Sequence, residues 1–284
     1  MGRIAVVTDS AACLPEGLLQ QYDIHVVPFG LMWGDEVLQD GIDITPAEFY
    51  HRLRTTEELP TTSQPSIGDF LRVYQSLAGK VDGIVSIHIP QALSGTYSGA
   101  QAAARMLEDI PVRVVDCGTA VMAQGFVVLA AARAAAAGAG LDEVVRAAEE
   151  MVPRVHLLAA LDRLDYLARS GRVPGVVAML GSALHIVPVF TIQQGHIMVV
   201  ARARSKRRAV KSMLDRMAEL AQGRPVHAAV FHADVPDEAE ALRTQVAERF
   251  DCLELYVTEF TPVMGSHTGP GVLGLAFYVE EPRS

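Results

Sequence analysis

The regular alternation of strand-like and helix-like segments in the first half constrains this chain most strongly. Short apolar runs rich in Ile and Val, typical of buried strands, alternate with segments of helical periodicity. Strands separated by helices in this way pair in parallel and carry the helices on both faces of the sheet. The sequence therefore predicts an α/β domain with a mostly parallel, Rossmann-like sheet. Its strands are expected at Ile4–Thr8, Ile24–Val27, Gly83–Ile89 and Val112–Asp116, and its helices after Pro15 and at Pro46–Leu53, Ile67–Leu77, Gly95–Leu107, Ala120–Ala137 and Asp142–Met151.

The pattern changes after Pro153, where strands begin to follow one another directly. The 284 residues are enough for two domains that each bury a core of their own. We therefore expect domains at 1–152 and 153–284, the second also α/β. Its strands are expected at Val155–Ala159, His185–Ile192, His196–Val200, Val226–Phe231, Leu253–Val257 and Val272–Tyr278, with a hairpin turn at Gln193–Gly195 and helices at about Lys206–Ala221 and Asp237–Phe250.

Composition and charge exclude several classes of protein. A hydrophobic fraction of 50% argues against disorder, and a net charge of −9 argues against nucleic-acid binding, which needs clustered cations. The three cysteines are far apart and fit reduced, buried thiols in a cytoplasmic protein. The first residues lack the apolar core of an export signal. Thr119–Leu141 and Val173–Phe190 are apolar, but polar residues, Gly and Pro interrupt them, so we expect no stable membrane insertion.

Motifs for the common catalytic chemistries are absent from the sequence. It contains no P-loop, no G-x-G-x-x-G after the first strand, no G-x-S-x-G and no H-E-x-x-H. The nine histidines do not have metal-ligand spacing. The residues therefore indicate no catalytic group, no metal site and no cofactor.

Three turns of the sequence are rich in hydroxyl groups. They lie where an expected strand ends or an expected helix begins, at Thr8–Ser10, Thr61–Ser66 and Ser94–Ser98. In open α/β sheets ligands bind beyond the carboxyl ends of the strands, where helix N-termini offer free N–H groups. These turns could hold a carboxylate or a phosphate without a metal. Each could equally be an ordinary helix cap, as Ser66 and Asp69 suggest for the helix from Ile67.

Two further features allow more than one interpretation. The apolar stretch Val173–Phe190 is either a buried helix followed by a buried strand, or the lining of an elongated apolar cavity. An anion site beside such a cavity would suit a fatty acid. His267 lies in the Gly- and Pro-rich segment Gly265–Gly271, which we expect to be a loop and not a helix. It is either a solvent-facing histidine or part of the site.

An ordered series of motifs along the whole chain resembles the DegV family of bacterial fatty-acid-binding proteins. Each motif is weak alone, but their order makes the resemblance specific. They are Val7–Ser10, Asp40-Gly-Ile-Asp43, Pro60–Ser66, Ser94–Tyr97, Leu164–Arg172, Gly181–Pro188, Arg202–Arg208 and His267–Gly271.

The resemblance implies two α/β domains, the second a mixed sheet with helices enclosing an elongated pocket for a long-chain fatty acid. It also implies a non-catalytic subunit that presents the carboxyl group to a separate ATP-dependent fatty-acid kinase, which forms an acyl phosphate for phospholipid synthesis. Thr62 and Ser94 would then contact the carboxylate. Ser63, Gly95 and His267 would lie beside it, and Arg172 and Arg204 would face the kinase.

The sequence departs from the family pattern at two positions, and the residues also allow one alternative function. Val187 stands where many relatives have a basic residue, and His185 stands in place of an amide, which affects the charge of that strand. The alternative function is a serine hydrolase of acyl esters that uses Ser94 with His267, oriented by Asp9. The sequence around Ser94 weighs against it, because a nucleophile elbow places the serine between two glycines on a strained turn, whereas Leu93 precedes Ser94.

Overall fold

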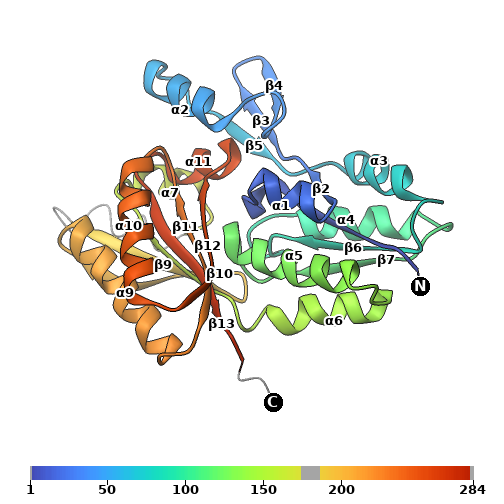
Figure 1. Cartoon of the computed structure of the whole chain (residues 1–284). Helices are drawn as coiled ribbons and strands as arrows, with labels where there is room; N and C mark the ends of the chain where they lie inside the picture. The colour runs from blue at the N-terminus through green and yellow to red at the C-terminus, as the bar shows by residue number, and fades with distance from the viewer. Residues whose placement is uncertain (1, 174–185, 282–284) are drawn as a thin grey trace.

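Two separate β-sheets organise the chain (Figure 1). The structure is a computed structural model that describes residues 2–173 and 186–281. The first sheet has the order β2-β1-β6-β7, and all of its strands are parallel. This confirms the parallel sheet that the sequence predicts. The strands are β1 (Ile4–Asp9), β2 (Ile24–Val27), β6 (Gly83–His88) and β7 (Val112–Asp116).

Helices cover both faces of this first sheet. The helices α3 (Ile67–Leu77) and α4 (Thr96–Arg105) pack on one face, and α5 (Val121–Ala136) and α6 (Leu141–Met151) pack on the other. The short helix α1 (Glu16–Gln21) precedes β2. Ser66 and Asp69 form the capping box expected at the start of α3, so the polar pair fixes where this helix begins.

The second sheet is mixed and has the order β10-β9-β8-β13-β11-β12. Only β11 and β12 are parallel neighbours, and α9 and α10 cover one face (Figure 1). Every strand of the first sheet precedes residue 153 and every strand of this sheet follows it, although the division into two domains there stays a prediction. The elements are β8 (His156–Ala160), α7 (Asp165–Ser170), β9 (Val187–Gln193), β10 (His196–Ala203), α9 (Lys206–Ala221), β11 (Val226–His232), α10 (Pro236–Arg249), β12 (Cys252–Glu259) and β13 (Leu273–Val279).

The helix α5 lies between the two sheets and packs on both. It contacts β1 and β6 of the first sheet and β11 and β13 of the second. Residues from Val121 to Leu129 are all buried, because a helix enclosed by sheets on opposite sides has no solvent face. Its apolar character therefore reflects burial between the two sheets. Within the described part of the chain, no helix combines the length and apolar character that a bilayer crossing requires.

A small antiparallel sheet that the sequence analysis did not predict follows β2. It consists of β3 (Gly30–Trp33), β4 (Glu36–Gln39) and β5 (Thr61–Ser63), and α2 (Pro46–Thr55) packs beside it. Trp33 anchors this unit, because its buried ring meets Phe49 of α2 edge to face at 5.6 Å. The strands are short and β5 contains only Thr and Ser, so no apolar alternation marks them.

Two local expectations need correction. The segment around His267 is not a loop, because α11 spans Pro262–Thr268. Pro262 begins this helix. Gly265 has no Cβ, and a Cβ at this position would lie only 2.6 Å from the Tyr50 hydroxyl.

The second correction concerns the cysteines. Cys13 and Cys117 are buried and free as expected, but Cys252 is only half-buried. His185 and most of the stretch Val173–Phe190 lie outside the described residues.

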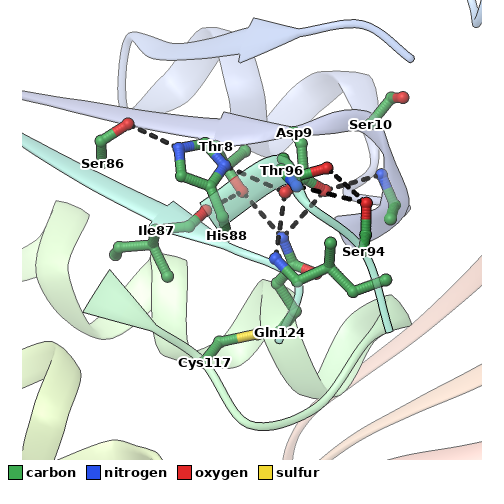
Figure 2. A network of polar contacts seen from close by, with 12 residues as sticks. Thr8, Asp9, Ser10, Ser86, Ile87, His88, Ser94, Thr96, Cys117 and Gln124 are labelled. Carbon is green, nitrogen blue, oxygen red and sulfur yellow. Dashed lines mark hydrogen bonds and ion pairs between the residues drawn. The ribbon is translucent and has the colours of Figure 1, made fainter. Parts of the chain in front are cut away.

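A fully buried polar network holds the end of β1 (Figure 2). Asp9 Oδ1 accepts hydrogen bonds from the Ala11 N–H and from Gln124 Nε2, each at 3.1 Å. Asp9 Oδ2 lies 3.0 Å from His88 Nδ1 and accepts from the Ile89 N–H at 3.0 Å. Four partners thus satisfy one buried carboxylate, and Gln124 links it to α5. The turn Thr8–Ser10 is therefore structural.

Replacement of Gln124 by leucine tests this link. Gln124→Leu removes donors to Thr8 and Asp9 and leaves both oxygens short of a partner in a site that water does not reach. We expect the free energy of unfolding to fall by about 1–3 kcal/mol. Urea denaturation measures the change. Gln20→Leu on the exposed face of α1 is the control, with an expected change within about 0.5 kcal/mol. An unchanged midpoint for Gln124→Leu would contradict the role of the network.

Candidate functional site

An apolar cavity of about 370 Å³ lies among residues from both halves of the chain. This is within the size range of small-molecule sites, which are mostly apolar with a few polar groups. The polar groups come from Thr62, Gln64, Ser94, Ser170, Arg172, His267 and Thr268. The apolar lining consists of Ala11, Phe29, Ile89, Leu93, Ala120, Val121, Leu157, Ala159, Leu161, Leu167, Phe190, Ile192, Ile197, Phe231, Phe260, Val263, Met264 and Val272, with Gly95 between them.

The hairpin of β9 and β10 contributes one wall of the cavity. Its two-residue turn is Gln194-Gly195, with φ 49° and 76°, as in a type I′ turn. The Gly195 N–H donates to the Gly118 carbonyl at 2.8 Å, so the tip of the hairpin reaches the loop after β7. The predicted hairpin is confirmed, and it joins the second sheet to the loop after β7 beside the cavity.

Val121 at the start of α5 contributes to another wall. Its φ is 56°, in the left-handed region that β-branched residues seldom adopt. The residue is buried, and it lines the cavity together with Ala120. An unfavourable backbone conformation therefore places an apolar side chain at the ligand space.

Thr62 and His267 meet at the polar part of the cavity. Thr62 lies in the middle of β5 and not at a helix start, where its turn was expected to place it. Its Oγ1 is 3.0 Å from Nε2 of His267 on α11, and either atom donates according to the tautomer. The structure thus joins residues that are 205 positions apart in the sequence.

Ser94 and Gly95 come from the turn before α4. Ser94 Oγ lies 2.7 Å from Thr96 Oγ1 and accepts from the Thr96 N–H at 3.3 Å, so it also shapes the helix start. The Gln64 amide packs directly on Gly95, since a Cβ there would lie 2.1 Å from Oε1 of Gln64. Gln64 was missed in the sequence analysis, although it belongs to the conspicuous segment Thr61–Ser66. Its amide adds hydrogen-bonding capacity beside the two hydroxyls.

The electrostatics of the polar part favour an anion. Burial, and then the charge of Arg172, lowers the pKa of His267 to about 4, so the imidazole is neutral at pH 7. Neutral hydroxyl, amide and imidazole groups can donate to a carboxylate without a competing internal salt bridge. Arg172 is exposed and its Nη1 donates to the Ser170 carbonyl at 2.6 Å, which holds a positive charge at the edge of the cavity.

Other predicted residues lie away from the cavity. Ser63 follows Thr62 on β5 and is exposed, because successive side chains on a strand point to opposite faces. Arg204 is exposed in the short connection between β10 and α9. Lys206, in the same basic run, forms ion pairs with Asp162 at 2.9 Å and Glu238 at 2.8 Å. These pairs offset the unfavourable position of Lys206 at a helix N-terminus.

The three residues of the hydrolase alternative form no hydrogen-bonded triad in the described structure, although Ser94 and His267 line the same cavity. Asp9 contacts His88, whereas His267 contacts Thr62 and Ser94 contacts Thr96. A different Ser–His–Asp array does form. Ser86 Oγ lies 2.7 Å from His88 Nε2, and His88 contacts Asp9 (Figure 2). Ser86 and His88 are both 0% exposed, so this array belongs to the core and offers no accessible nucleophile.

The lowered pKa of His267 predicts a pH-dependent stability. Between pH 6.5 and about 4 the unfolded chain binds a proton that the folded chain does not, so stability falls as the pH decreases through this range. For His267→Gln we expect the loss between pH 7 and pH 5 to be smaller by about 2 kcal/mol. Urea denaturation at both pH values measures it, with the exposed His196→Gln as the control. Equal losses in the parent and His267→Gln would show that His267 is not buried neutral.

Comparisons with known proteins identify the family of this chain. A family profile described as an uncharacterised protein of the DegV family matches residues 3–280. A DegV domain-containing protein of Streptomyces coelicolor is 39% identical over 274 residues, which covers 96% of this chain and 97% of the relative.

Solved structures of relatives have the same fold. A DegV family protein from Thermus thermophilus, described for its fatty acid binding, has a TM-score of 0.91 at 34% identity over 98% of this chain and 100% of its own. DegV from Bacillus subtilis, described as a fatty acid binding protein, has a TM-score of 0.91 at 32% identity over 99% of this chain and 100% of its own. Because the profile and these relatives match over almost their whole length, the chain belongs to the DegV family.

Proposed function

We propose that this protein binds a long-chain fatty acid and presents its carboxyl group to a separate ATP-dependent kinase subunit, which forms an acyl phosphate. One observation carries the proposal: the apolar cavity has hydroxyl, amide and imidazole groups on one part of its lining, with Arg172 at the edge. Two relatives of known structure are described as fatty acid binding, which supports the choice of ligand. The protein would act in the bacterial cytoplasm.

The acyl chain would supply most of the binding energy. Burial of each methylene group contributes about 0.8 kcal/mol, so a long acyl chain offers roughly 10 kcal/mol before the costs of ordering are subtracted. The hydrogen bonds from Thr62, Ser94 and Gln64 would mainly orient the head group. This division of roles needs no cofactor in the protein itself, because ATP would be bound by the kinase subunit.

Native mass spectrometry tests the ligand directly. Protein purified from a heterologous bacterial host should carry one C14–C18 fatty acid, which extraction with organic solvent should release. Turnover of activated acyl esters at Ser94 by lipid-free protein would instead support the hydrolase. Protein that purifies without lipid and fails to take up oleate or palmitate would overturn the proposal.

The head-group hydroxyls give the next prediction. Thr62→Ala and Ser94→Ala should each weaken fatty-acid binding by about 1–3 kcal/mol, because each removes a donor from a buried charged acceptor. Displacement of a fluorescent fatty acid from delipidated, reloaded protein measures the affinity. Thr61→Ala and Ser98→Ala, exposed neighbours on the same two segments, are the matched controls. Full affinity in the double variant Thr62→Ala/Ser94→Ala would place the carboxylate elsewhere.

The exposed Arg204 gives a prediction about the partner. Arg204→Ala should strongly slow acyl-phosphate formation by the kinase subunit of the same bacterium while the bound fatty acid stays in place, since a surface arginine at the centre of an interface affects the complex and not the cavity. Arg72→Ala, an exposed arginine on α3, is the control. Normal phosphorylation by Arg204→Ala at limiting protein concentration would remove Arg204 from the docking surface.

A further inference from the structure

The segment Asp40-Gly-Ile-Asp43 has no role in the proposed function, yet the structure gives it a defined shape between β4 and α2. Gly41 has φ 75°, and its N–H donates to the Ile44 carbonyl at 3.2 Å. Asp43 Oδ2 accepts from the Gln39 N–H at 2.8 Å and closes the turn. This compact turn leaves Asp40 only 2% exposed, so the carboxyl group is directed into the protein.

The buried carboxyl group of Asp40 reaches the start of α11. Asp40 Oδ1 accepts a hydrogen bond from the Val263 N–H at 3.0 Å, across 223 residues of sequence. Thr261, the residue that precedes α11, makes no capping hydrogen bond with its side chain. Asp40 therefore takes the place of the N-cap and also puts an acceptor at the positive end of the helix.

The helix α11 depends on such external contacts. It has seven residues, and a helix this short is not stable in isolation, so its position depends on contacts with the rest of the protein. Beyond the Asp40 bond, Gly265 packs so closely on α2 that a Cβ would lie 2.7 Å from Cε1 of Phe49. His267 lies one turn after Val263 and reaches Thr62 from this helix. The position of the imidazole thus follows from the position of α11.

We propose that Asp40 is a positioning residue, which caps α11 and thereby holds His267 against Thr62 in the cavity. Asp40 is not among the residues that line this cavity, so it would act through the helix and not by touching the ligand. The importance of His267 for a fatty acid rests on the proposed function, whereas its position in the protein does not.

The surroundings of Asp40 indicate that its carboxylate does more than fill space in the core. Burial raises the pKa of Asp40 to about 6, although the Ser10 hydroxyl, the Val263 N–H and the Thr261 hydroxyl lower it. Asp9, Cys13 and Tyr50 are the titratable groups that face it. A carboxylate buried to this degree is costly, so packing alone would favour an apolar residue here.

The experiment follows the imidazole of His267 by NMR in the full-length protein labelled with ¹³C-histidine. Asp40→Asn keeps the acceptor, whereas Asp40→Ala and the similarly shaped Asp40→Leu remove it. Asp69→Ala removes a comparable cap from α3 and is the matched control for lost stability. His267→Gln identifies the signal. In Asp40→Ala and Asp40→Leu we expect the pKa of His267 to rise from about 4 towards 6.5, while Asp40→Asn and Asp69→Ala retain the parent value.

The functional readout is the release of bound oleate. Loss of the cap should accelerate release roughly five- to tenfold in Asp40→Ala and Asp40→Leu, with the parent rate restored in Asp40→Asn. A His267 titration that is unchanged in both variants, or equally changed in Asp69→Ala, would overturn the positioning role. If the parent binds no oleate, the proposed function fails, and the titration still decides the role of Asp40.

A measurement on the unmodified protein tests the Asp40 cap even if the variants do not fold. The Val263 amide proton should titrate with a midpoint near 6, because protonation of Asp40 weakens the bond that this amide donates. An amide resonance that stays constant from about pH 3 to about pH 8, the range in which a carboxyl group titrates, would contradict the cap.

Discussion

The burial of α5 between two sheets is the constraint on which the rest of the structure depends. The same helix completes the core of both halves, so neither sheet can shift without disturbing it. Gln124 ties it to the end of β1, while Ala120 and Val121 at its start line the cavity. The ligand space is therefore fixed by the same packing that joins the two sheets.

The polar part of the cavity combines residues from segments that no local signal connects. Thr62 comes from the small antiparallel sheet, Ser94 from the turn between β6 and α4, and His267 from the short helix α11 between β12 and β13. Each group is neutral at pH 7, and Arg172 supplies the positive charge. This separation suits an anionic ligand, because the neutral donors form no internal salt bridge that the ligand would have to break.

The sequence predicted elements whose signal is local. The helices Ile67–Leu77 and Lys206–Ala221 have the predicted bounds, because a capping serine and apolar periodicity define both. The small sheet was missed, since β5 carries no apolar alternation. The helix α11 was mistaken for a loop because glycine is locally a signal for a loop. Gly265 is in fact a glycine in a helix that packs closely on Tyr50, which lies far away in the sequence. Thr62, Ser94 and His267 were proposed from the family resemblance, and spacing alone would not have paired them.

The backbone of Val121 has a consequence for how such proteins can evolve. A β-branched residue at φ 56° holds about 1–3 kcal/mol of conformational strain, which a glycine would relieve. A glycine would also remove an apolar side chain from the cavity wall and enlarge the space there. Val121 also packs in the hydrophobic core, so a glycine would lose buried apolar surface together with the strain. An evolutionary change to glycine would therefore exchange a strained backbone for weaker core packing and a wider cavity.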